Sequence, residues 1–537
     1  MSNYCENNIN TDDKIWDEAI KDEIRAHLKN GTWFLIDKKK NQKVIGCKMI
    51  LKEKYKSDGT LERRKARLVA KGFAQRPGLD YTETYAPVVK LSSIRFLLGI
   101  AAEENLTLSQ LDVTTAFLNG DLGEEIYMKI PENLEKNLQD ILMEESLKED
   151  KDVFLKASKM LQDLKKSQNE KVCLLKKALY GLKQAGRQWF TKLDLKLKEF
   201  GFKCSQADPC IYISSEGGER CIIGVYVDDL VIAHSNTKVF ENIKDKLKNT
   251  FAMRDLGKLN YCLGMEFKQT DESIMVNQQK YINNLLEKFG MQNCKSTATP
   301  MELGLKLEKG NTEEIEKPYQ NLIGSLMYLA VATRPDISYA VSYLSQFNTC
   351  YNNLHWTAAK RVLRYLMGTK EIGLTFRKTG EKIIGFADAD WGSCTVDRKS
   401  YTGCCFIFAG AAVSWESKKQ RTVALSTAEA EYMSLTEASK EAIHLKNLAA
   451  EMGLYQEKII ILNDNQAAQS LVKNPVISSK SKHISIKEHF IRDVVLSGKI
   501  EICYQQTEEM VADIFTKALQ RYRHIYLREC LGLYLTQ

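Results

Sequence analysis

The sequence lacks the features that mark membrane, secreted or disordered proteins. No apolar run approaches the roughly 20 residues needed to cross a bilayer, and the polar start MSNYCENNIN lacks the apolar core of a signal peptide. Only 8 of the 537 residues are Pro, and no tract is of low complexity. We therefore expect a folded chain of roughly two to four domains with no membrane partner.

Cysteine is present, but it is not arranged for metal or disulfide chemistry. The 14 cysteines are scattered, without a Cys-x-x-Cys pair or a zinc-knuckle spacing, so zinc is not supported. In a chain without a secretion signal we expect them to be reduced thiols. Cys404 and Cys405 fall in an apolar run that resembles a strand, where packing explains them better.

Positive charge is concentrated in one part of the chain. The net charge is only +8, but the segment 38–76 holds 14 Lys or Arg against three acids. A solvated face is the simpler explanation of an isolated charge run. A phosphate-binding surface is the alternative, and the motifs that follow favour it.

Hydrophobic periodicity predicts a mixed α and β chain. Helices are expected over 16–28, 92–104, 281–289 and onward from Thr427. Strands are expected over 32–36, 48–55, 108–113, 382–387, 403–408, 411–415 and 458–462. The charged stretch 131–171 is expected to be a solvent-facing helical insertion, and the polar stretch 296–318 a linker.

Two acidic stretches suit a phosphoryl-transfer site with two metal ions. Asp112 falls near the end of an expected strand, and YVDDL places Asp228 and Asp229 between two apolar strands. Such transfer to a 3′-hydroxyl uses two Mg²⁺ ions about 4 Å apart, which carboxylate oxygens suit. An Asp-Asp hairpin turn is the simpler explanation of YVDDL. Buried strands, however, rarely carry paired acids that are not neutralised, so we expect the three carboxylates to converge.

The chain resembles the copia-type (Pseudoviridae-like) LTR retrotransposon Pol polyproteins in a series of motifs. They are RRKARLVAKGFAQ at 63–75, LDVTTAFLNGDLGEEIYMKIP at 111–131, LKKALYGLKQAGRQW at 175–189, YVDDL at 226–230 and LGKLNYCLGMEF at 256–267. The likeness runs with gaps from about Trp16 to Leu533. Gly186 and Met49 depart from the family's usual residues, and neither departure removes a metal ligand.

This resemblance implies roles for residues of the polymerase part. It makes Asp112 and the two aspartates of YVDDL the catalytic ligands of Mg²⁺, with Mn²⁺ as a substitute, and it makes Tyr226 a substrate-binding residue. Phe117 falls where the family places an aromatic beneath the sugar, where it would exclude a ribose 2′-hydroxyl. Without the motif, a core Phe would explain it better. Lys65 and Arg67 are candidates for binding the incoming triphosphate, and 263–266 is expected near the primer end.

A second set of acids lies in the C-terminal part, which resembles the copia-type ribonuclease H throughout. In that fold, acids on the first strand, on the first helix, after the fourth strand and on the last helix hold two Mg²⁺ ions. The residues in that order are Asp388, Glu431, Asp464 and Asp513. The resemblance makes these four residues both catalytic and metal-binding.

Some assignments in this part have alternatives. Asp390 is a rival to Asp388, and Glu429 is a rival to Glu431, which we prefer because AEYMSL at 430–435 matches the helix of this fold. In SKHISIKEHFIRD at 481–493, His483 and His489 could serve product release, proton transfer, packing or phosphate binding.

The expected fold class is a multidomain α+β and α/β chain. A right-hand fingers–palm–thumb polymerase is followed by a connection segment and a ribonuclease H-like α/β domain. The expected boundaries are 1–15 for an N-terminal tail, 16–270 for fingers and palm with the insertion at 131–171, 271–296 for a thumb-like segment, 297–378 for linker and connection, and 379–537 for the ribonuclease H-like domain.

The expected function is RNA-directed DNA polymerisation together with cleavage of the RNA strand of RNA–DNA hybrids. The resemblance implies dNTPs, RNA and DNA template–primers, a tRNA primer and other retroelement proteins as partners, in cytoplasmic particles with nuclear access. No protease Asp-Ser/Thr-Gly triplet and no integrase His-His-Cys-Cys set occurs, which favours the downstream end of a polyprotein. A degenerate or domesticated remnant that only binds nucleic acid is the alternative. All seven candidate positions are acidic, which favours an enzyme over such a remnant. A nuclease with a dead polymerase is less favoured, because Asp112, Asp228 and Asp229 are intact.

Overall fold

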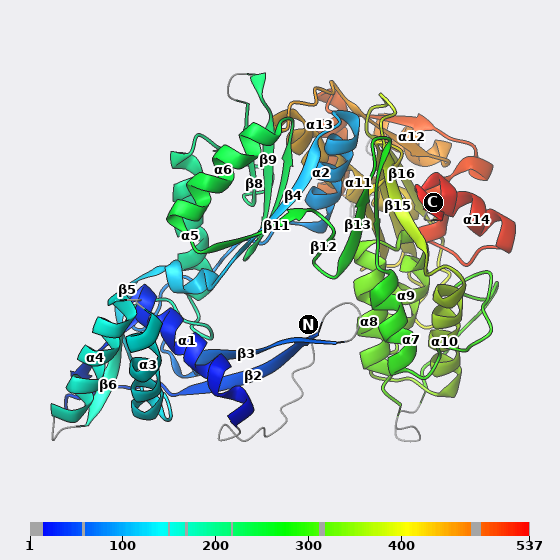
Figure 1. Cartoon of the computed structure of the whole chain (residues 1–537). Coiled ribbons are helices and arrows are strands. Elements are labelled where there is room, and N and C mark those ends of the chain that lie inside the picture. The colour runs from blue at the N-terminus through cyan, green and yellow to red at the C-terminus, as the bar shows by residue number, and fades with distance from the viewer. Residues whose placement is uncertain are drawn as a thin grey trace.

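A computed structural model describes residues 14–55, 60–148, 151–166, 170–215, 218–310, 317–473 and 485–535. Figure 1 shows the parts arranged like a hand, with the fingers at lower left, the palm sheet at the top and a helical bundle at lower right. The C-terminal α/β unit lies behind and to the right of the palm.

The N-terminal part forms the fingers. An antiparallel sheet of order β1-β6-β5 lies beside the long β2–β3 hairpin. The elements are α1 (Asp17–Asn30), β1 (Trp33–Asp37), β2 (Cys47–Tyr55), β3 (Leu61–Ala70), β5 (Asp121–Met128), α3 (Leu134–Lys148), α4 (Lys151–Lys166) and β6 (Lys171–Lys177).

The charged stretch 131–171 is helical, as expected, but it is not wholly solvent-facing. Leu134, Leu138 and Ile141 recur on one side of α3 and are buried against α1 and α4. Apolar residues at this spacing form one stripe of a helix, which is stable only when it is covered. The insertion therefore forms a small core with the first helix of the chain.

The palm is a six-stranded antiparallel sheet of order β11-β4-β10-β9-β8-β7. Successive residues of β9 such as Ile222 and Ile223 are both buried, which explains its continuous apolar run. The elements are α2 (Leu91–Glu103), β4 (Thr107–Val113), α5 (Ala185–Glu199), β7 (Lys203–Cys204), β8 (Ile211–Ser214), β9 (Cys221–Tyr226), β10 (Asp229–His234), α6 (Thr237–Thr250) and β11 (Met253–Lys258).

A second antiparallel sheet, of order β12-β13-β14-β15-β21, continues from the palm. The chain leaves it after β14, forms a helical bundle and returns at β15. The elements are β12 (Tyr261–Cys262), β13 (Met265–Gln269), β14 (Ser273–Asn277), α7 (Gln279–Lys288), α8 (Tyr319–Ala332), α9 (Ser338–Ser345), α10 (Asn353–Gly368), β15 (Ile372–Arg377) and β21 (Leu533–Leu535). The four helices share one hydrophobic core, which includes Met301 and Leu307 of the expected linker. The boundary between thumb and connection stays a prediction.

The C-terminal unit is a five-stranded sheet of order β18-β17-β16-β19-β20. β16 pairs in parallel with β19, and β19 with β20, whereas β17 is antiparallel to its neighbours. This is the arrangement of ribonuclease H-like folds. The elements are β16 (Ile384–Ala389), β17 (Tyr401–Phe408), β18 (Ala411–Lys419), α11 (Thr427–Glu451), β19 (Ile459–Asn463), α12 (Gln466–Lys473), α13 (Ser485–Leu496), β20 (Ile500–Tyr504), the 3-10 helix η8 (Val511–Phe515) and α14 (Arg521–Cys530).

These observations confirm the predicted fold class, a polymerase hand joined to a ribonuclease H-like unit. Cys404 and Cys405 are buried in β17, as packing residues would be. Every cysteine in the described ranges is free. In those same ranges, no helix is both long enough and apolar enough to span a membrane.

Candidate active sites

The register of the palm sheet brings the predicted polymerase residues side by side. Asp229 on β10 lies directly opposite Asp112 on β4 and opposite Tyr226 on β9. Arg254 on β11 lies opposite Asp112 on the other side. Directly opposed residues of antiparallel strands have Cβ atoms about 5 Å apart on one face. The four side chains therefore form a row, and Gln110 Nε2 donates a 3.0 Å hydrogen bond to Asp229 Oδ1 beside it.

The turn between β9 and β10 is strained and is held from two sides. Val227 has a φ of 57°, a rare conformation for a β-branched residue. Its carbonyl oxygen accepts a 2.6 Å hydrogen bond from Trp189 Nε1 of α5. The carbonyl oxygen of Asp228 accepts a 2.9 Å bond from the N–H of Val113 at the end of β4. Neighbouring motifs thus fix the position of the acidic turn.

The surroundings of the turn are partly buried and carry charge of both signs. Burial raises the pKa of Asp228, and Asp112 adds to this effect, whereas Arg67 and Lys65 of the fingers oppose it. The β12–β13 hairpin also lies near these acids. Burial, followed by the two aspartates of the turn, raises the pKa of its Cys262. Fingers, palm and this hairpin therefore meet at the acids.

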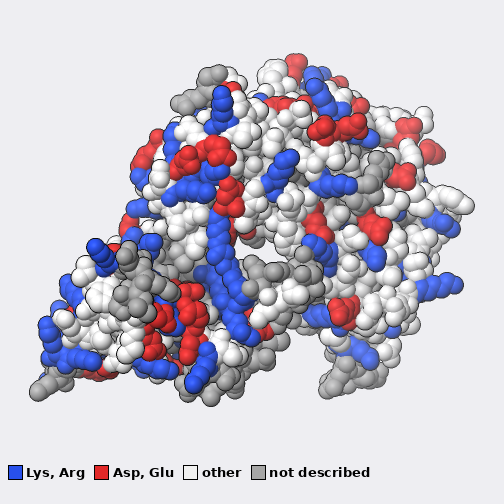
Figure 2. Space-filling model, in the orientation of Figure 1, with Lys and Arg blue, Asp and Glu red and all other residues white. Residues whose placement is uncertain are grey.

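An aromatic and cationic cluster lies between the fingers and the palm acids. The rings of Phe117 and Tyr180 are 4.7 Å apart, and the guanidinium of Arg67 lies 4.1 Å from the centre of the Tyr180 ring. Lys65 lies two residues earlier on β3, on the same side of that strand. Burial raises the pKa of Tyr180 to about 12. In Figure 2, Lys and Arg side chains form a stripe beside the central hollow.

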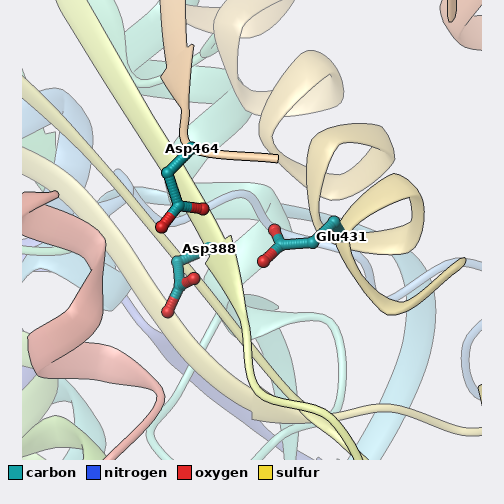
Figure 3. Close-up of side chains that lie close together, drawn as sticks. All are labelled: Asp388, Glu431 and Asp464. Carbon is teal, nitrogen blue, oxygen red and sulfur yellow. The ribbon is translucent and has the colours of Figure 1, made fainter. Parts of the chain in front are cut away.

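The C-terminal unit brings three of its four predicted acids together. The parallel pairing of β16 and β19 reaches Phe386 and Leu462, so that Asp388 and Asp464, two residues further on, meet at the same edge. Glu431 of α11 points toward them (Figure 3). Ligand oxygens of these three residues all lie within 4.8 Å of one another. Such a set of hard oxygen donors fits Mg²⁺.

This compact group differs from the acids of the palm. Across the described ranges, it is the one group of three or more His, Cys, Asp or Glu residues whose ligand atoms lie so close. Asp112, Asp228 and Asp229 do not form such a group. Asp388 and Glu431 are 3% and 5% exposed. Burial raises the pKa of both carboxyl groups. Repulsion from Asp388 and Asp464 adds to the effect on Glu431, and repulsion from Asp513 and Asp464 adds to it on Asp388, where Lys517 opposes it.

The fourth acid, Asp513, lies beside this group and is neutralised by cations. It is on the short helix η8, not on the last α-helix as expected. Lys517 Nζ lies 2.8 Å from Asp513 Oδ1 and 3.8 Å from Asp388 Oδ2, and Arg523 Nη2 lies 3.3 Å from Asp513 Oδ2. Burial by itself would lower the pKa of Lys517, but Asp388 and Asp513 raise it overall. Two acids of the site thus share a lysine.

A glycine allows η8 to approach the first strand. Gly403 pairs with Asp388, and a Cβ on Gly403 would lie 2.7 Å from Phe515 Cβ and 2.8 Å from Thr516 Cγ2. The close approach lets the Thr516 hydroxyl donate a hydrogen bond to Asp388 Oδ2. The absent side chain therefore brings η8, with its acid, next to Asp388.

The rival acids have structural partners instead. Asp390 Oδ1 accepts a 2.8 Å hydrogen bond from the N–H of Tyr401, and its other oxygen accepts one from Ser393. Glu429 accepts a 2.7 Å bond from the N–H of Leu425 ahead of α11. Neither belongs to the compact group. His483 lies outside the described residues, and His489 falls within α13.

Several residues of these surroundings were not predicted. Tyr180 and Trp189 lie within the motif at 175–189, and their aromatic side chains were the one feature of the sequence that could have indicated a role. Asn463, whose Nδ2 donates a 3.0 Å bond to Glu431 Oε2, directly precedes a predicted acid. Lys517 follows Asp513 by four residues, the spacing of an ion pair on a helix. Arg254 gave no signal, because its neighbour β4 is far away in the chain.

Taken together, the fold and the two acidic sites define a polymerase hand with a second, ribonuclease H-like carboxylate centre. The family of reverse transcriptases (RNA-dependent DNA polymerases) matches residues 30–154 and 140–303. The chain is 38% identical over 530 residues to the retrovirus-related Pol polyprotein from transposon TNT 1-94 of Nicotiana tabacum, with 96% of this chain and 38% of that one covered. It is also 38% identical over 514 residues to that from transposon RE2 of Arabidopsis thaliana, with 95% and 33% covered.

The chain therefore belongs to the reverse transcriptase family, and the resemblance to the copia-type Pol polyproteins is confirmed. It spans 38% and 33% of the length of these two relatives. A foamy viral protease–reverse transcriptase in complex with double-stranded DNA is 13% identical, with a TM-score of 0.47, and 91% of this chain and 69% of that one are covered.

Proposed function

We propose that this chain is an RNA-directed DNA polymerase with ribonuclease H activity, which copies retrotransposon RNA into DNA and degrades the RNA of the resulting hybrid. The observation that carries the proposal is the row of Asp112 and Asp229 next to Asp228 in a member of the reverse transcriptase family. The compact group of three acids in the C-terminal unit supports the second activity.

In the palm, Asp112, Asp228 and Asp229 hold Mg²⁺, or Mn²⁺ in its place. A metal held there would supply a lowered pKa of the primer 3′-hydroxyl and stabilisation of the charge on the phosphates. The chain's own residues position the reactants. Tyr226 borders the acids on β9, and Phe117 lies beneath the nucleotide sugar, so that its ring excludes a ribose 2′-hydroxyl.

On the fingers side, Lys65 and Arg67 bind the triphosphate of the incoming dNTP. Both cations act on the pKa of Asp228, which supports this location. Tyr180 orients Arg67 through the contact of its ring with the guanidinium.

In the C-terminal unit, Asp388, Glu431, Asp464 and Asp513 hold the Mg²⁺ that cleavage of the RNA strand needs. Lys517 and Arg523 pair with the two oxygens of Asp513 and hold its carboxylate in position. The four acids carry more negative charge than these cations balance, which favours the binding of divalent cations.

We also propose the domain boundaries given above: 1–15, 16–270 with the insertion 131–171, 271–296, 297–378 and 379–537. The substrates are dNTPs, template–primers and RNA–DNA hybrids. A tRNA primer and other retroelement proteins are the proposed partners, in cytoplasmic particles with access to the nucleus.

The test uses purified protein, Mg²⁺, a primed poly(rA) template and dTTP, beside the double variant Asp228→Asn, Asp229→Asn. We expect primer extension that is lost in the double variant, while cleavage of a labelled RNA–DNA hybrid persists. A wild-type protein that binds the hybrid but neither extends nor cuts would contradict the proposal and support a binding remnant.

A further inference from the structure

One side of the palm helix α2 is built to contact the ribonuclease H-like unit. Arg95, Gly99 and Glu103 follow one another at intervals of four residues, which places them in one line along the helix. Each of the three touches a residue of the segment 379–535. We call this line the α2 seam.

Arg95 is the central residue of the α2 seam. Its Nε donates a 2.8 Å hydrogen bond to the carbonyl oxygen of Val413 on β18, and its Nη1 donates 2.8 Å bonds to those of Val331 and Ala332 on α8. The guanidinium lies 3.8 Å from the centre of the Trp415 ring. Arg95 is 6% exposed. One buried cation thus joins the palm, the helical bundle and the C-terminal unit.

The other two positions complete the fit. A Cβ on Gly99 would lie 2.7 Å from Phe408 Cδ1, so only a glycine lets the end of β17 pack this closely. Glu103 Oε1 accepts a 2.9 Å bond from the N–H of Thr379 and a 2.8 Å bond from its hydroxyl, and Oε2 accepts a 3.0 Å bond from the N–H of Gly380. The α2 seam therefore combines a cation, a close approach and an anion along one helix.

The ribonuclease H-like unit is also tied at both of its ends. The chain enters it directly after β15, which pairs with β14, and it finishes in β21, which pairs with β15. Entry and exit thus lie in one sheet that continues from the palm (Figure 1). A single cluster of buried hydrophobic residues extends from the palm into this unit. Such anchoring differs from a flexible linker, which would allow a range of orientations.

We propose that the α2 seam fixes the distance along a bound hybrid between the primer 3′ end and the RNA cut, with Arg95 as the positioning residue. This rests on the proposed function. A duplex is stiff over a length on the order of 150 base pairs, so two sites on one rigid body meet it at a constant spacing. The planar guanidinium of Arg95 holds its donors in a fixed arrangement that reaches three carbonyl oxygens on two elements, and it stacks on the Trp415 ring as a lysine ammonium does not.

The test maps RNA cuts at single-nucleotide resolution on an end-labelled RNA template that carries a dideoxy-terminated DNA primer. We expect one narrow group of cuts for the wild type. In Arg95→Met the cuts spread, and the main product falls by about two- to tenfold, the fold-change that corresponds to one net hydrogen bond. Arg25→Met is the matched control. Its guanidinium pairs with Glu18 and Asp22 in the fingers, so its cuts stay at the wild-type position.

A second variant, Glu103→Ala, keeps the proposal testable if Arg95→Met does not fold, because Glu103 makes its contacts near the surface. It removes the acceptor for Thr379 and Gly380. We therefore expect the cuts to spread over more positions than in the wild type, but over fewer than in Arg95→Met. Scattered cuts in the wild type would overturn the proposal. Folded variants whose cuts match the wild type in position and spread would also overturn it.

Limited digestion with trypsin separates this proposal from the proposed function. Lys378 and Lys382 flank the contact with Glu103. We expect cleavage there to be slow in the wild type and faster in Glu103→Ala, whether or not the protein has enzymatic activity. Equal rates of tryptic cleavage in the wild type and in Glu103→Ala would contradict the contact between Glu103 and residues 379–380, and with it the α2 seam. A protein that resists trypsin as expected but neither extends nor cuts would contradict only the function on which the proposal rests.

Discussion

The two carboxylate sites of this chain are built in different ways. The palm acids are half-buried and spread along a row, and the backbone sets their positions through strand register and a strained turn. The acids of the ribonuclease H-like unit are compact, and burial and repulsion raise the pKa of Asp388 and Glu431. In the first site the cost in free energy lies in a strained backbone turn. In the second site it lies in the repulsion between buried carboxylates.

The largest expected effect separates the compact site from its rivals. We expect Asp388→Asn to lower the rate of hybrid cleavage by about 10³-fold or more, because a proposed metal ligand is lost. Asp390→Asn is the matched control two residues away. The amide oxygen of Asn can still accept the bond from the N–H of Tyr401, so cleavage should stay near the wild-type rate. Equal losses in the two variants would contradict this assignment. The measurement is single-turnover cleavage of a labelled hybrid.

The next effect concerns the strained turn. Trp189→Phe removes the donor to the carbonyl oxygen of Val227, which loosens the turn without touching an acid. We expect primer extension to fall by about tenfold, in line with a misplaced reactive group, while hybrid cleavage is unchanged. In the control Trp33→Phe no bond is lost, because within the described ranges Trp33 Nε1 has no hydrogen-bond partner. A similar loss in both variants would point to packing rather than to the turn.

A stability measurement tests the repulsion between the buried carboxylates of the ribonuclease H-like unit. Because the pKa of Glu431 is raised on folding, its charged form destabilises the fold. The stability that comes from its protonation is complete below a pH of about 4.5 and is lost as the pH rises through the folded pKa. We therefore expect Glu431→Gln to raise the free energy of unfolding by about 1–2 kcal/mol at pH 8 without divalent ions, and less as the pH falls.

The control for this effect is Glu429→Gln, at the exposed start of the same helix. Its side chain accepts a bond from the N–H of Leu425 and is not part of the compact group. We expect no stabilisation from this change. Thermal unfolding in EDTA measures the stability of both variants. A Glu431→Gln protein that melts at a lower temperature than the wild type would show that repulsion at Glu431 does not destabilise the fold.

The smallest effect concerns the shared lysine. Lys517→Met removes the ammonium between Asp388 and Asp513. The side chain is 42% exposed, so we expect a loss of only about 1 kcal/mol in the absence of divalent ions. Lys517→Arg keeps the charge and should lose less. Because the site loses a cation, the stabilisation by Mg²⁺ should be larger in Lys517→Met than in the wild type. An equal Mg²⁺ effect in the two proteins would contradict the role of the lysine.

The sequence predicted the elements whose signal is local. The helix from Thr427 begins at the predicted residue, and the strands around Asp112 and Asp388 lie within one or two residues of their expected bounds. Order along the chain and the family motifs were sufficient to select the acids that the sheet edges bring together. The hydrophobic periodicity predicts these elements reliably, because it follows which side of a helix or strand is buried in the core.

The remaining features depend on partners that are distant in the chain. Arg95 is an unusual residue for a buried helix side, and its acceptors at Val331 and Val413 come from other units. Likewise, no local pattern reveals that Trp189 holds the turn at Val227, or that Gly403 makes room for η8. Such contacts arise from tertiary packing, which a single sequence does not encode in its periodicity.

The most direct test of two separate sites is one measurement on one substrate. A hybrid with a labelled RNA template and a differently labelled DNA primer reports extension and cleavage together, for the wild type, Asp112→Asn and Asp464→Asn. We predict that Asp112→Asn loses extension and keeps cleavage, and that Asp464→Asn keeps extension and loses cleavage. Loss of both activities in either variant, or of neither, would contradict the account.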